Sequence, residues 1–222
     1  MIKACIFDLD GVICDTAKYH FIAWQRIADG FGVEFNLIDN ESLKGVSRVD
    51  SLIQILKKGN VSVSDSEFEE ALIKKNNEYL SLVSGMRTDE ILPGVEEFLQ
   101  SLKDNNIRIA LGSASKNAPL ILEKIGLTHY FEAIIDGNQV IHGKPNPEVF
   151  DKGAKALNVL PQDTVVFEDA VAGVEAANRG EFLSVGVGDS HVLRNAKFVI
   201  SGFENFTLLD LQSTFDTLTK TA

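Results

Sequence analysis

The sequence contains little cysteine and no long apolar segment. Two of its 222 residues are cysteine, Cys5 and Cys14, and neither has a partner at the spacing of a C-x-x-C redox or zinc motif. Isolated thiols are typical of a reducing compartment, because structural disulfides form in oxidising ones. No run approaches the roughly 18 apolar residues that a membrane-spanning helix requires. These absences exclude a disulfide-built miniprotein and predict a cytoplasmic protein without a membrane partner.

Positive charge is also scarce. The chain has 21 Lys and Arg against 32 Asp and Glu, which gives a formal net charge of -11. Because this charge repels phosphate backbones, we expect no nucleic acid partner. An anionic small substrate would need a local cluster of Lys, Arg and backbone N–H groups. With 45% hydrophobic residues the composition is that of an ordinary globular protein, and we expect a monomer.

Short apolar runs alternate with helical patterns along most of the chain. The runs cover residues 4–7, 107–111, 164–167 and 182–187, and the helical patterns cover 95–102, 120–125, 149–157, 171–177 and 206–218. Nearly continuous apolar runs are typical of parallel strands that are covered on both faces. The alternation therefore predicts an α/β fold, a doubly wound parallel sheet with a Rossmann-like core.

One stretch interrupts this alternation. About 100 residues separate the first apolar run from the second, whereas a strand–helix–strand unit takes about 30. Residues 17–82 have helical periodicity, with Phe21, Trp24 and Ala28 on one face of the first helix. We therefore predict an α/β core formed by residues 1–16 and 83–222, with a small α-helical cap inserted over residues 17–82.

Polar side chains follow the ends of the predicted strands. They are Asp8, Asp10, Ser113, Lys144, Glu168 and Asp169. In open parallel sheets, ligands bind beyond the carboxyl ends of the strands. Four carboxylates gathered there would repel one another unless a cation lay among them. Because oxygen donors without thiolates favour Mg²⁺, we predict a magnesium site at this edge.

Asp8 and Asp10 are suited to act as a pair. Residues two apart in an extended segment point to the same side, and Gly11 then permits a sharp turn. One carboxylate can attack a phosphorus atom and form an aspartyl phosphate, while the other, protonated, delivers a proton to the leaving oxygen. The alternative role for this pair is to cap a helix or a turn.

These motifs, in this order, resemble those of the haloacid dehalogenase-like superfamily of aspartate-nucleophile phosphotransferases. The matching segments are residues 8–16, Ser113, Lys144 with Pro145, and Glu168 with Asp169. The likeness covers nearly the whole chain, and the family's small helical cap lies where the helices are inserted. Within the superfamily, residues 15–20, 43–48, 75–76 and 113–117 resemble the β-phosphoglucomutase group.

The resemblance implies a reaction and a role for each motif. The group interconverts β-glucose 1-phosphate and glucose 6-phosphate through β-glucose 1,6-bisphosphate, so the partner would be a sugar phosphate. Asp8 would be the nucleophile and Asp10 the general acid and base. Ser113 and Lys144 would hold the transferring phosphoryl group. One Mg²⁺ per chain would be held by Asp8, the Asp10 carbonyl, Glu168 and Asp169.

Two cations of the cap are candidates for substrate recognition. Lys75 lies in the apolar stripe of Leu72 and Tyr79, where a lysine is unfavourable without an anion. Arg48, soon after Gly45, suits a bidentate grip on the non-transferring phosphate. The alternatives are a lysine stem that reaches the rim of the cap and an arginine on a helix surface. The other predicted substrate-binding residues are His20, Trp24, Gly45, Val46, Ser47, Ser115, Lys116 and Asn117.

Three functions remain open at this stage. The first is a hexose-phosphate mutase, and the second is a small-molecule phosphatase in which water attacks the aspartyl phosphate. The core motifs do not separate these two, whereas the cap residues favour the mutase. The third, a catalytically inactive binding module, is disfavoured because both acids of the first motif and both of the last are present. Ala170 departs from the mutase pattern, in which a small hydroxyl residue can occur.

Overall fold

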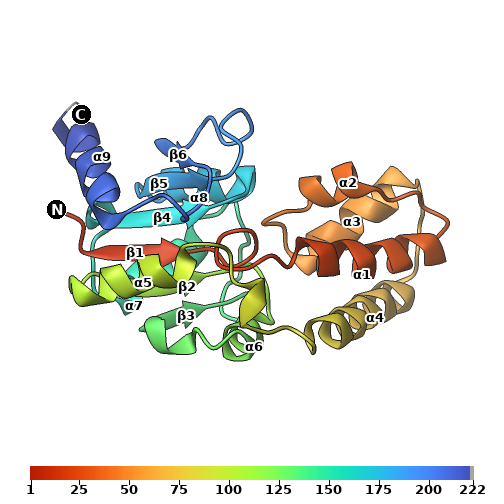
Figure 1. Cartoon of the computed structure of the whole chain (residues 1–222). Helices are drawn as coiled ribbons and strands as arrows, with labels where there is room; N and C mark the ends of the chain where they lie inside the picture. Colours follow the sequence, from red (N-terminus) through yellow and green to blue (C-terminus); the bar gives the residue numbers. More distant parts are fainter. Residues whose placement is uncertain (221–222) are drawn as a thin grey trace.

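Within the part of the chain that the structure describes, six parallel strands form one sheet in the order β3-β2-β1-β4-β5-β6. The computed structural model describes residues 1–220 (Figure 1). The strands are β1 (Ala4–Phe7), β2 (Arg108–Gly112), β3 (Ala133–Ile135), β4 (Thr164–Glu168), β5 (Leu183–Val187) and β6 (Phe198–Ile200). The strand order reverses direction at β1, which lies between β2 and β4. The predicted α/β fold with a doubly wound parallel sheet is confirmed.

Helices cover both faces of this sheet. They are α5 (Val95–Asp104), α6 (Ala118–Lys124), α7 (Glu148–Ala156), α8 (Val171–Arg179) and α9 (Leu208–Lys220). Along β1 the side chains alternate, so that Phe7 packs in a cluster with Phe98 of α5, whereas Ile6 packs in another with Phe150 of α7. Residues from α5, α6 and α9 contribute to the first cluster, and residues from α7 and α8 to the second. Two-sided burial explains why β1 has no alternating polar positions.

The edge strands β3 and β6 were absent from the sequence prediction. Each has three residues, which is too short to produce a recognisable apolar run. The four predicted strands are present, with ends that differ by at most one residue, and the final helix begins at Leu208 rather than at residue 206. Sequence patterns therefore found the central strands, where burial is continuous, and missed the edges.

The remaining long helices lie together on one side of the sheet body (Figure 1). They are α1 (Ala17–Gly30), α2 (Leu37–Ser42), α3 (Arg48–Lys58) and α4 (Asp65–Val83). These helices share a separate hydrophobic cluster that contains Trp24, Leu52 and Leu72. The end of α4 is different, because Tyr79 and Val83 pack in the cluster of the sheet body. The separate cluster supports our proposal that residues 17–82 form a cap on a core of residues 1–16 and 83–222.

A cluster of phenylalanine rings joins α5 and the segment before α9 to the sheet. The Phe98 ring lies 5.1 Å from that of Phe203 and 5.6 Å from that of Phe167, centroid to centroid. We predict that Phe98→Ala lowers the free energy of unfolding by about 3–5 kcal/mol, because the cavity left among these rings cannot collapse fully. Urea unfolding measures this change. The control Leu209→Ala, at a side chain that is 76% exposed, should change stability by no more than about 0.5 kcal/mol. Equal effects of the two substitutions would contradict the prediction.

Candidate active site

Asp8 lies directly after β1, where it meets a buried lysine. Only 4% of Asp8 is exposed, and its Oδ1 accepts a 2.5 Å hydrogen bond from Nζ of Lys144. Lys144 also donates to Oε1 of Glu168, the last residue of β4. The Asp8 N–H donates to the Phe167 carbonyl, 2.9 Å away, which continues the strand pairing to the site. The lysine thus joins the carboxylates at the ends of two adjacent strands.

The charges of this buried group depend on one another. Burial alone lowers the pKa of Lys144, but the carboxylates of Asp8 and Glu168 outweigh it and leave that pKa raised. Burial raises the pKa of Glu168 to about 7, against the lowering effect of Lys144. Because Lys144 stays protonated at neutral pH, a phosphate group that reaches Asp8 meets a fixed positive charge.

Asp10 turns back toward Asp8. Its N–H donates to Asp8 Oδ2 at 3.0 Å, and its own Oδ1 accepts a hydrogen bond from the hydroxyl of Thr16, the residue before α1. Burial, followed by the neighbouring Asp8 charge, raises the pKa of Asp10 to about 6. A carboxyl group with such a pKa can both donate and accept a proton near neutral pH.

Gly11 allows Asp169 to approach the turn that holds Asp8 and Asp10. The φ angle of Gly11 is +77°, and a Cβ there would lie 2.2 Å from Oδ2 of Asp169. Burial and the nearby carboxylates of Glu168 and Asp8 raise the pKa of Asp169 well above its usual value. Only a glycine at position 11 leaves room for the Asp169 carboxylate beside this turn, so the acidic side chains of the site lie close together.

The donors around this space fit a divalent metal. Among the described residues, no three acidic, histidine or cysteine side chains gather as a metal site by themselves. Mg²⁺, however, usually takes one or two carboxylates and completes its shell with water and substrate oxygens. Asp8 and Asp169 can supply two carboxylates, and Asp10 can supply its main-chain carbonyl. Glu168 can supply a third carboxylate; like Asp8 it also accepts hydrogen bonds, from Lys144 at Oε1 and from the Ala170 N–H at Oε2, 2.9 Å away.

Ser113 begins an ordered loop after β2. Its side chain is buried, and its Oγ accepts from the Ser115 N–H at 3.1 Å. The Ser115 hydroxyl in turn accepts from the Asn117 N–H at 3.3 Å. Asn117 Nδ2 donates to Oδ1 of Asn76 on α4, 3.1 Å away, so the loop also touches the cap. Two serine hydroxyls thus hold the loop that carries the predicted substrate-binding residues Ser115, Lys116 and Asn117.

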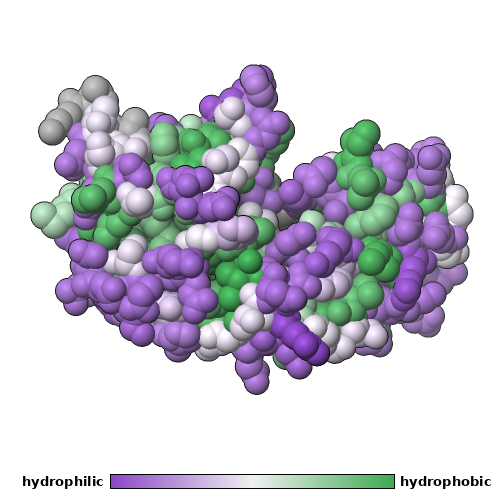
Figure 2. Space-filling view, viewed as in Figure 1, coloured by the Kyte–Doolittle hydropathy of each residue, from purple (hydrophilic) through white to green (hydrophobic). Residues whose placement is uncertain are grey.

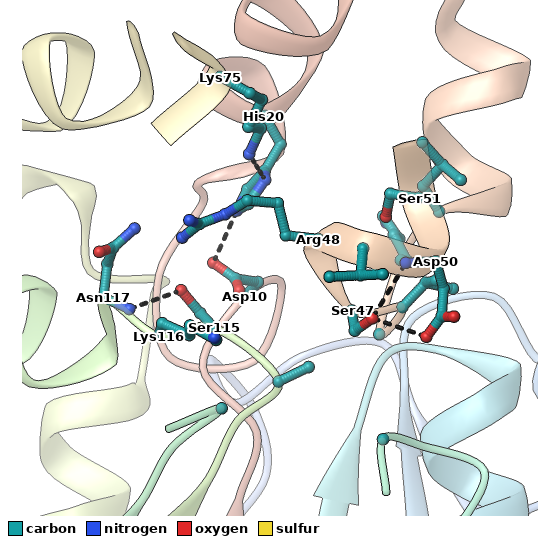
Figure 3. A pocket seen from close by; sticks show the side chains of 18 of the residues that line it. Asp10, His20, Ser47, Arg48, Asp50, Ser51, Lys75, Ser115, Lys116 and Asn117 are labelled. Atoms are coloured by element: carbon teal, nitrogen blue, oxygen red, sulfur yellow. Dashed lines mark hydrogen bonds and ion pairs between the residues drawn. The ribbon is translucent and has the colours of Figure 1, made fainter. Parts of the chain in front are cut away.

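A chain of contacts reaches Asp10 from the cap (Figure 3). Lys75 of α4 is 3% exposed, and its Nζ lies 2.9 Å from Nδ1 of His20 on α1. Nε2 of that histidine lies 4.0 Å from Asp10 Oδ1. The Trp24 ring is buried and lies 4.8 Å from Lys75 Nζ, so it supports the lysine as part of the cap core. The predicted burial of Lys75 is confirmed, whereas its role toward substrate stays a prediction.

The basic side chains of this part of the cap can bind an anion. Burial, and then the charge of Arg48, lower the pKa of Lys75 to about 7. Burial also lowers the pKa of His20 far below its usual value, and Lys75 and Arg48 act in the same direction. Arg48 extends into the cleft and forms no ion pair within the part of the chain that the structure describes (Figure 3). An anion placed among these groups would restore their charged forms.

These side chains surround one cleft of about 730 Å³ between the cap and the carboxyl edge of the sheet. In the space-filling view the molecule is hollowed between these two bodies (Figure 2). The predicted site residues that line the cleft are Asp8, Asp10, His20, Trp24, Gly45, Val46, Ser47, Arg48, Lys75, Ser115, Lys116, Asn117 and Asp169. Ser113, Lys144 and Glu168 do not line it and are buried. The cleft thus brings together predicted site residues from segments that lie far apart in the sequence.

Comparison with known proteins identifies the family. Residues 2–180 match the model for haloacid dehalogenase-like hydrolases. The chain belongs to this family. Within it, the β-phosphoglucomutase of Bacillus subtilis (strain 168) is 41% identical over 208 residues, which cover 93% of this chain and 92% of that protein. The family membership predicted from the motifs is confirmed.

Two further family members show the range of related proteins. The crystal structure of β-phosphoglucomutase from Clostridium difficile is 42% identical, has a TM-score of 0.96, and is matched over 99% of this chain and 100% of that one. The phosphorylated carbohydrates phosphatase of Thermotoga maritima is 30% identical over 89% of this chain and 90% of its own. The chain is therefore similar both to mutases and to phosphatases of the family.

Sequence reasoning gave no role to three residues that contact the site. They are Thr16, Lys44 and Asn76. Lys44 Nζ lies 3.2 Å from Asp169 Oδ2. A pattern that could have pointed to it is the adjacent Gly45, whose φ is +71° and where a Cβ would lie 3.1 Å from that of Ala170. Asn76 belongs to the segment 75–76 that carries the family resemblance, but its contact with Asn117 lies beyond sequence patterns because that partner is on a distant segment.

The raised pKa of Asp10 predicts a pH-dependent effect on stability. A carboxyl group whose pKa rises from 3.8 to about 6 on folding destabilises the fold when it ionises. This effect is absent below the unfolded pKa and complete above the folded one. We predict that the stability gained by Asp10→Asn is about 1 kcal/mol larger at about pH 7.5 than at about pH 5, as measured by urea unfolding. The exposed Asp29→Asn serves as the control, and a gain for Asp10→Asn that is independent of pH would contradict the assigned environment.

Proposed function

We propose that this protein is a phosphomutase that interconverts β-D-glucose 1-phosphate and D-glucose 6-phosphate. The reaction would pass through an aspartyl-phosphate enzyme and a β-glucose 1,6-bisphosphate intermediate. The observation that carries this proposal is the cleft, in which the Asp8 carboxylate and the cap cations Arg48 and Lys75 line the same space. A bisphosphate needs one place where a phosphoryl group is transferred and another where the second phosphate is held. The similarity to β-phosphoglucomutases over nearly the whole chain supports the choice of sugar.

Asp8 and Asp10 carry the proposed chemistry. The Asp8 carboxylate attacks phosphorus, the bond from phosphorus to the sugar oxygen breaks, and that oxygen takes a proton from Asp10. In the other half-reaction a sugar hydroxyl attacks the phosphorus of the aspartyl phosphate and gives its proton to Asp10, while the bond from phosphorus to Asp8 breaks and the Asp8 carboxylate is released. The hydrogen bond and charge of Lys144, together with the Ser113 hydroxyl, offset the charge on the transferring oxygens.

The family implies a divalent metal, and we propose one Mg²⁺ per chain. Its proposed ligands are Asp8, the Asp10 carbonyl, Glu168 and Asp169. When bound, the ion offsets repulsion between the nucleophile and the phosphate oxygens. Glu168 stays a proposed fourth ligand, and its contact with Lys144 also holds that lysine beside Asp8.

The cap and the loop after β2 would hold the rest of the substrate. Arg48, with its guanidinium in the cleft and no carboxylate partner among the described residues, is the proposed ligand of the non-transferring phosphate. His20 and Lys75 are proposed to bind substrate near Asp10. Lys75 can bind a substrate hydroxyl or a phosphate oxygen. The remaining proposed contacts are Gly45, Val46, Ser47, Ser115, Lys116 and Asn117, all of which line the cleft.

A sugar phosphatase is the second candidate, because phosphatases are among the relatives and water could attack the same aspartyl phosphate. The cap cations Arg48 and Lys75 in the cleft favour the mutase, since a bisphosphate intermediate needs a second place that holds a phosphate. A catalytically inactive module is disfavoured, because the carboxylates of Asp8, Asp10 and Asp169 all line the cleft.

The cellular location, the oligomeric state and the binding partners of the protein are also proposed. None of the described helices is long and apolar enough to cross a membrane. Cys5 and Cys14 are both buried and unpaired. These findings support the proposed cytoplasmic location, and we propose a monomer that binds sugar phosphate and neither nucleic acid nor membrane.

The nucleophile is tested by Asp8→Asn. We predict that this variant forms no phosphoenzyme, because the neutral amide is a far weaker nucleophile than the carboxylate. Intact-protein mass spectrometry after incubation with acetyl phosphate and Mg²⁺ detects the added phosphoryl group. Asp15→Asn, an exposed position near the same motif, is the matched control and should be labelled like wild type. Labelling of Asp8→Asn to the wild-type extent would remove Asp8 from its proposed role.

The choice between mutase and phosphatase is tested by following β-glucose 1-phosphate with phosphorus NMR. Wild type should produce glucose 6-phosphate with little inorganic phosphate. We predict that Arg48→Ala lowers the mutase rate by about 10-fold or more, since a charge-assisted contact is lost, while hydrolysis of the phosphoenzyme falls less. Lys57→Ala, a lysine at the end of the same helix, is the control. Inorganic phosphate as the main wild-type product would favour the phosphatase instead.

A further inference from the structure

The two connections between the cap and the sheet body are joined side by side. Cys14, before α1, forms an antiparallel bridge with Ile91, after α4. On either side of this bridge, the Leu92 N–H donates to the Ile13 carbonyl at 3.0 Å and the Asp15 N–H donates to the Glu90 carbonyl at 3.2 Å. The chain therefore leaves and re-enters the sheet body through one short ribbon of two strands.

The side chain of Glu90 extends this ribbon onto α1. Its Oε2 accepts a 2.5 Å bond from Nζ of Lys18, and its Oε1 accepts a 2.6 Å bond from the Tyr19 hydroxyl. Both donors belong to the first turn of α1, and 17% of the Glu90 side chain is exposed. These bonds from Lys18 and then Tyr19 hold the pKa of Glu90 below its usual value, so the carboxylate is ionised at neutral pH. We call this group of three residues the hinge clasp.

The turn held by the hinge clasp also carries two neighbours of Asp10. The N–H groups of Tyr19 and His20 both donate to the Thr16 carbonyl, at 3.0 and 3.1 Å. Thr16 donates its hydroxyl to the Asp10 carboxylate, and His20 lies 4.0 Å from it. Residues on both sides of Lys18 and Tyr19 thus face the proposed acid. A displacement of this turn would move both neighbours of Asp10 together.

The hinge clasp differs from an ordinary surface ion pair. An exposed pair contributes little, because its charges are screened and its side chains stay mobile. Glu90 instead accepts from two donors with its two oxygens, and its backbone belongs to the ribbon. The Lys58–Asp39 pair within the cap has a similar length of 2.5 Å and similar exposure, 41% and 21% against 48% and 17% for Lys18–Glu90. It therefore provides a matched comparison without a link to the ribbon.

We propose that Glu90 is a positioning residue for the general acid. Through Lys18 and Tyr19 it fixes the first turn of α1, and this turn places Thr16 and His20 against Asp10. The inference rests on the proposed function in that it assigns acid–base catalysis to Asp10. It applies equally to a mutase and to a phosphatase, because both must protonate or deprotonate an oxygen on the same phosphorus.

The catalytic test compares two leaving groups. A sugar oxygen needs a proton from Asp10 when it leaves, whereas the oxygen of 4-nitrophenyl phosphate needs little. We expect Glu90→Ala to lower kcat/KM, which reports phosphoryl transfer to Asp8, about 10-fold more for β-glucose 1-phosphate than for the aryl phosphate, because a small misplacement of a catalytic group has a large effect on rate. Glu90→Gln, which can still accept from Tyr19, should show a smaller difference. Lys18→Met should show a larger difference between the two substrates than Lys58→Met, and Lys58→Met should resemble wild type. Equal losses with both substrates would overturn the proposal.

Hydrogen exchange provides a readout that needs no turnover. Loss of the clasp should speed exchange of the Tyr19 and His20 amides by about 10-fold, the effect of losing roughly one hydrogen bond. Unchanged exchange in Glu90→Ala would overturn the proposal even if activity fell. If Glu90→Ala fails to fold, Tyr19→Phe and Glu90→Gln carry the same comparison. A wild type that turns over neither phosphate would contradict the proposed function alone, and exchange would still decide whether Glu90 holds this turn.

Discussion

The whole carboxyl edge of the sheet depends on one buried ammonium group. Lys144 lies between the carboxylates of Asp8 and Glu168, which end two adjacent strands. Removing either sign of charge would leave the other buried without compensation, an arrangement that is strongly unfavourable. The lysine therefore fixes the spacing of the strand ends as well as the direction of Asp8. Asp10 and Asp169 are placed in turn, because each is one or two residues away from a carboxylate that Lys144 holds.

Most of the fold can be derived from the sequence because burial in a parallel sheet is continuous. The run Ala4–Phe7 is apolar at each position since both of its faces are covered. The same reasoning identifies the helical insertion, which appears as an excess of residues between two strands. It fails for β3 and β6, where three residues at an edge carry too little apolar pattern. Boundaries also shift, since capping depends on local hydrogen bonds as well as on periodicity.

Some features of the site could likewise be predicted from the sequence, and others could not. Asp8 and Asp10 could be found from the sequence because they follow the end of a predicted strand, and Lys75 because it lies in the apolar stripe of a predicted helix. Contacts such as those of Glu90 with Lys18 and Tyr19 could not, because the residues are separated by 71 or 72 positions and each alone is an ordinary surface residue. The orientation of Glu168 toward Lys144 was also beyond the sequence, since a motif identifies a carboxylate and not the atom that it contacts.

The single two-stranded ribbon between the cap and the sheet body has a consequence for how such enzymes diversify. Because the polypeptide enters and leaves the cap at one place, the helices between Asp15 and Glu90 can be lengthened, shortened or exchanged without altering the strand order. A lineage can therefore change much of its substrate-binding surface by replacing the inserted helices, provided that the first turn of α1 keeps its contacts with Glu90 and Asp10.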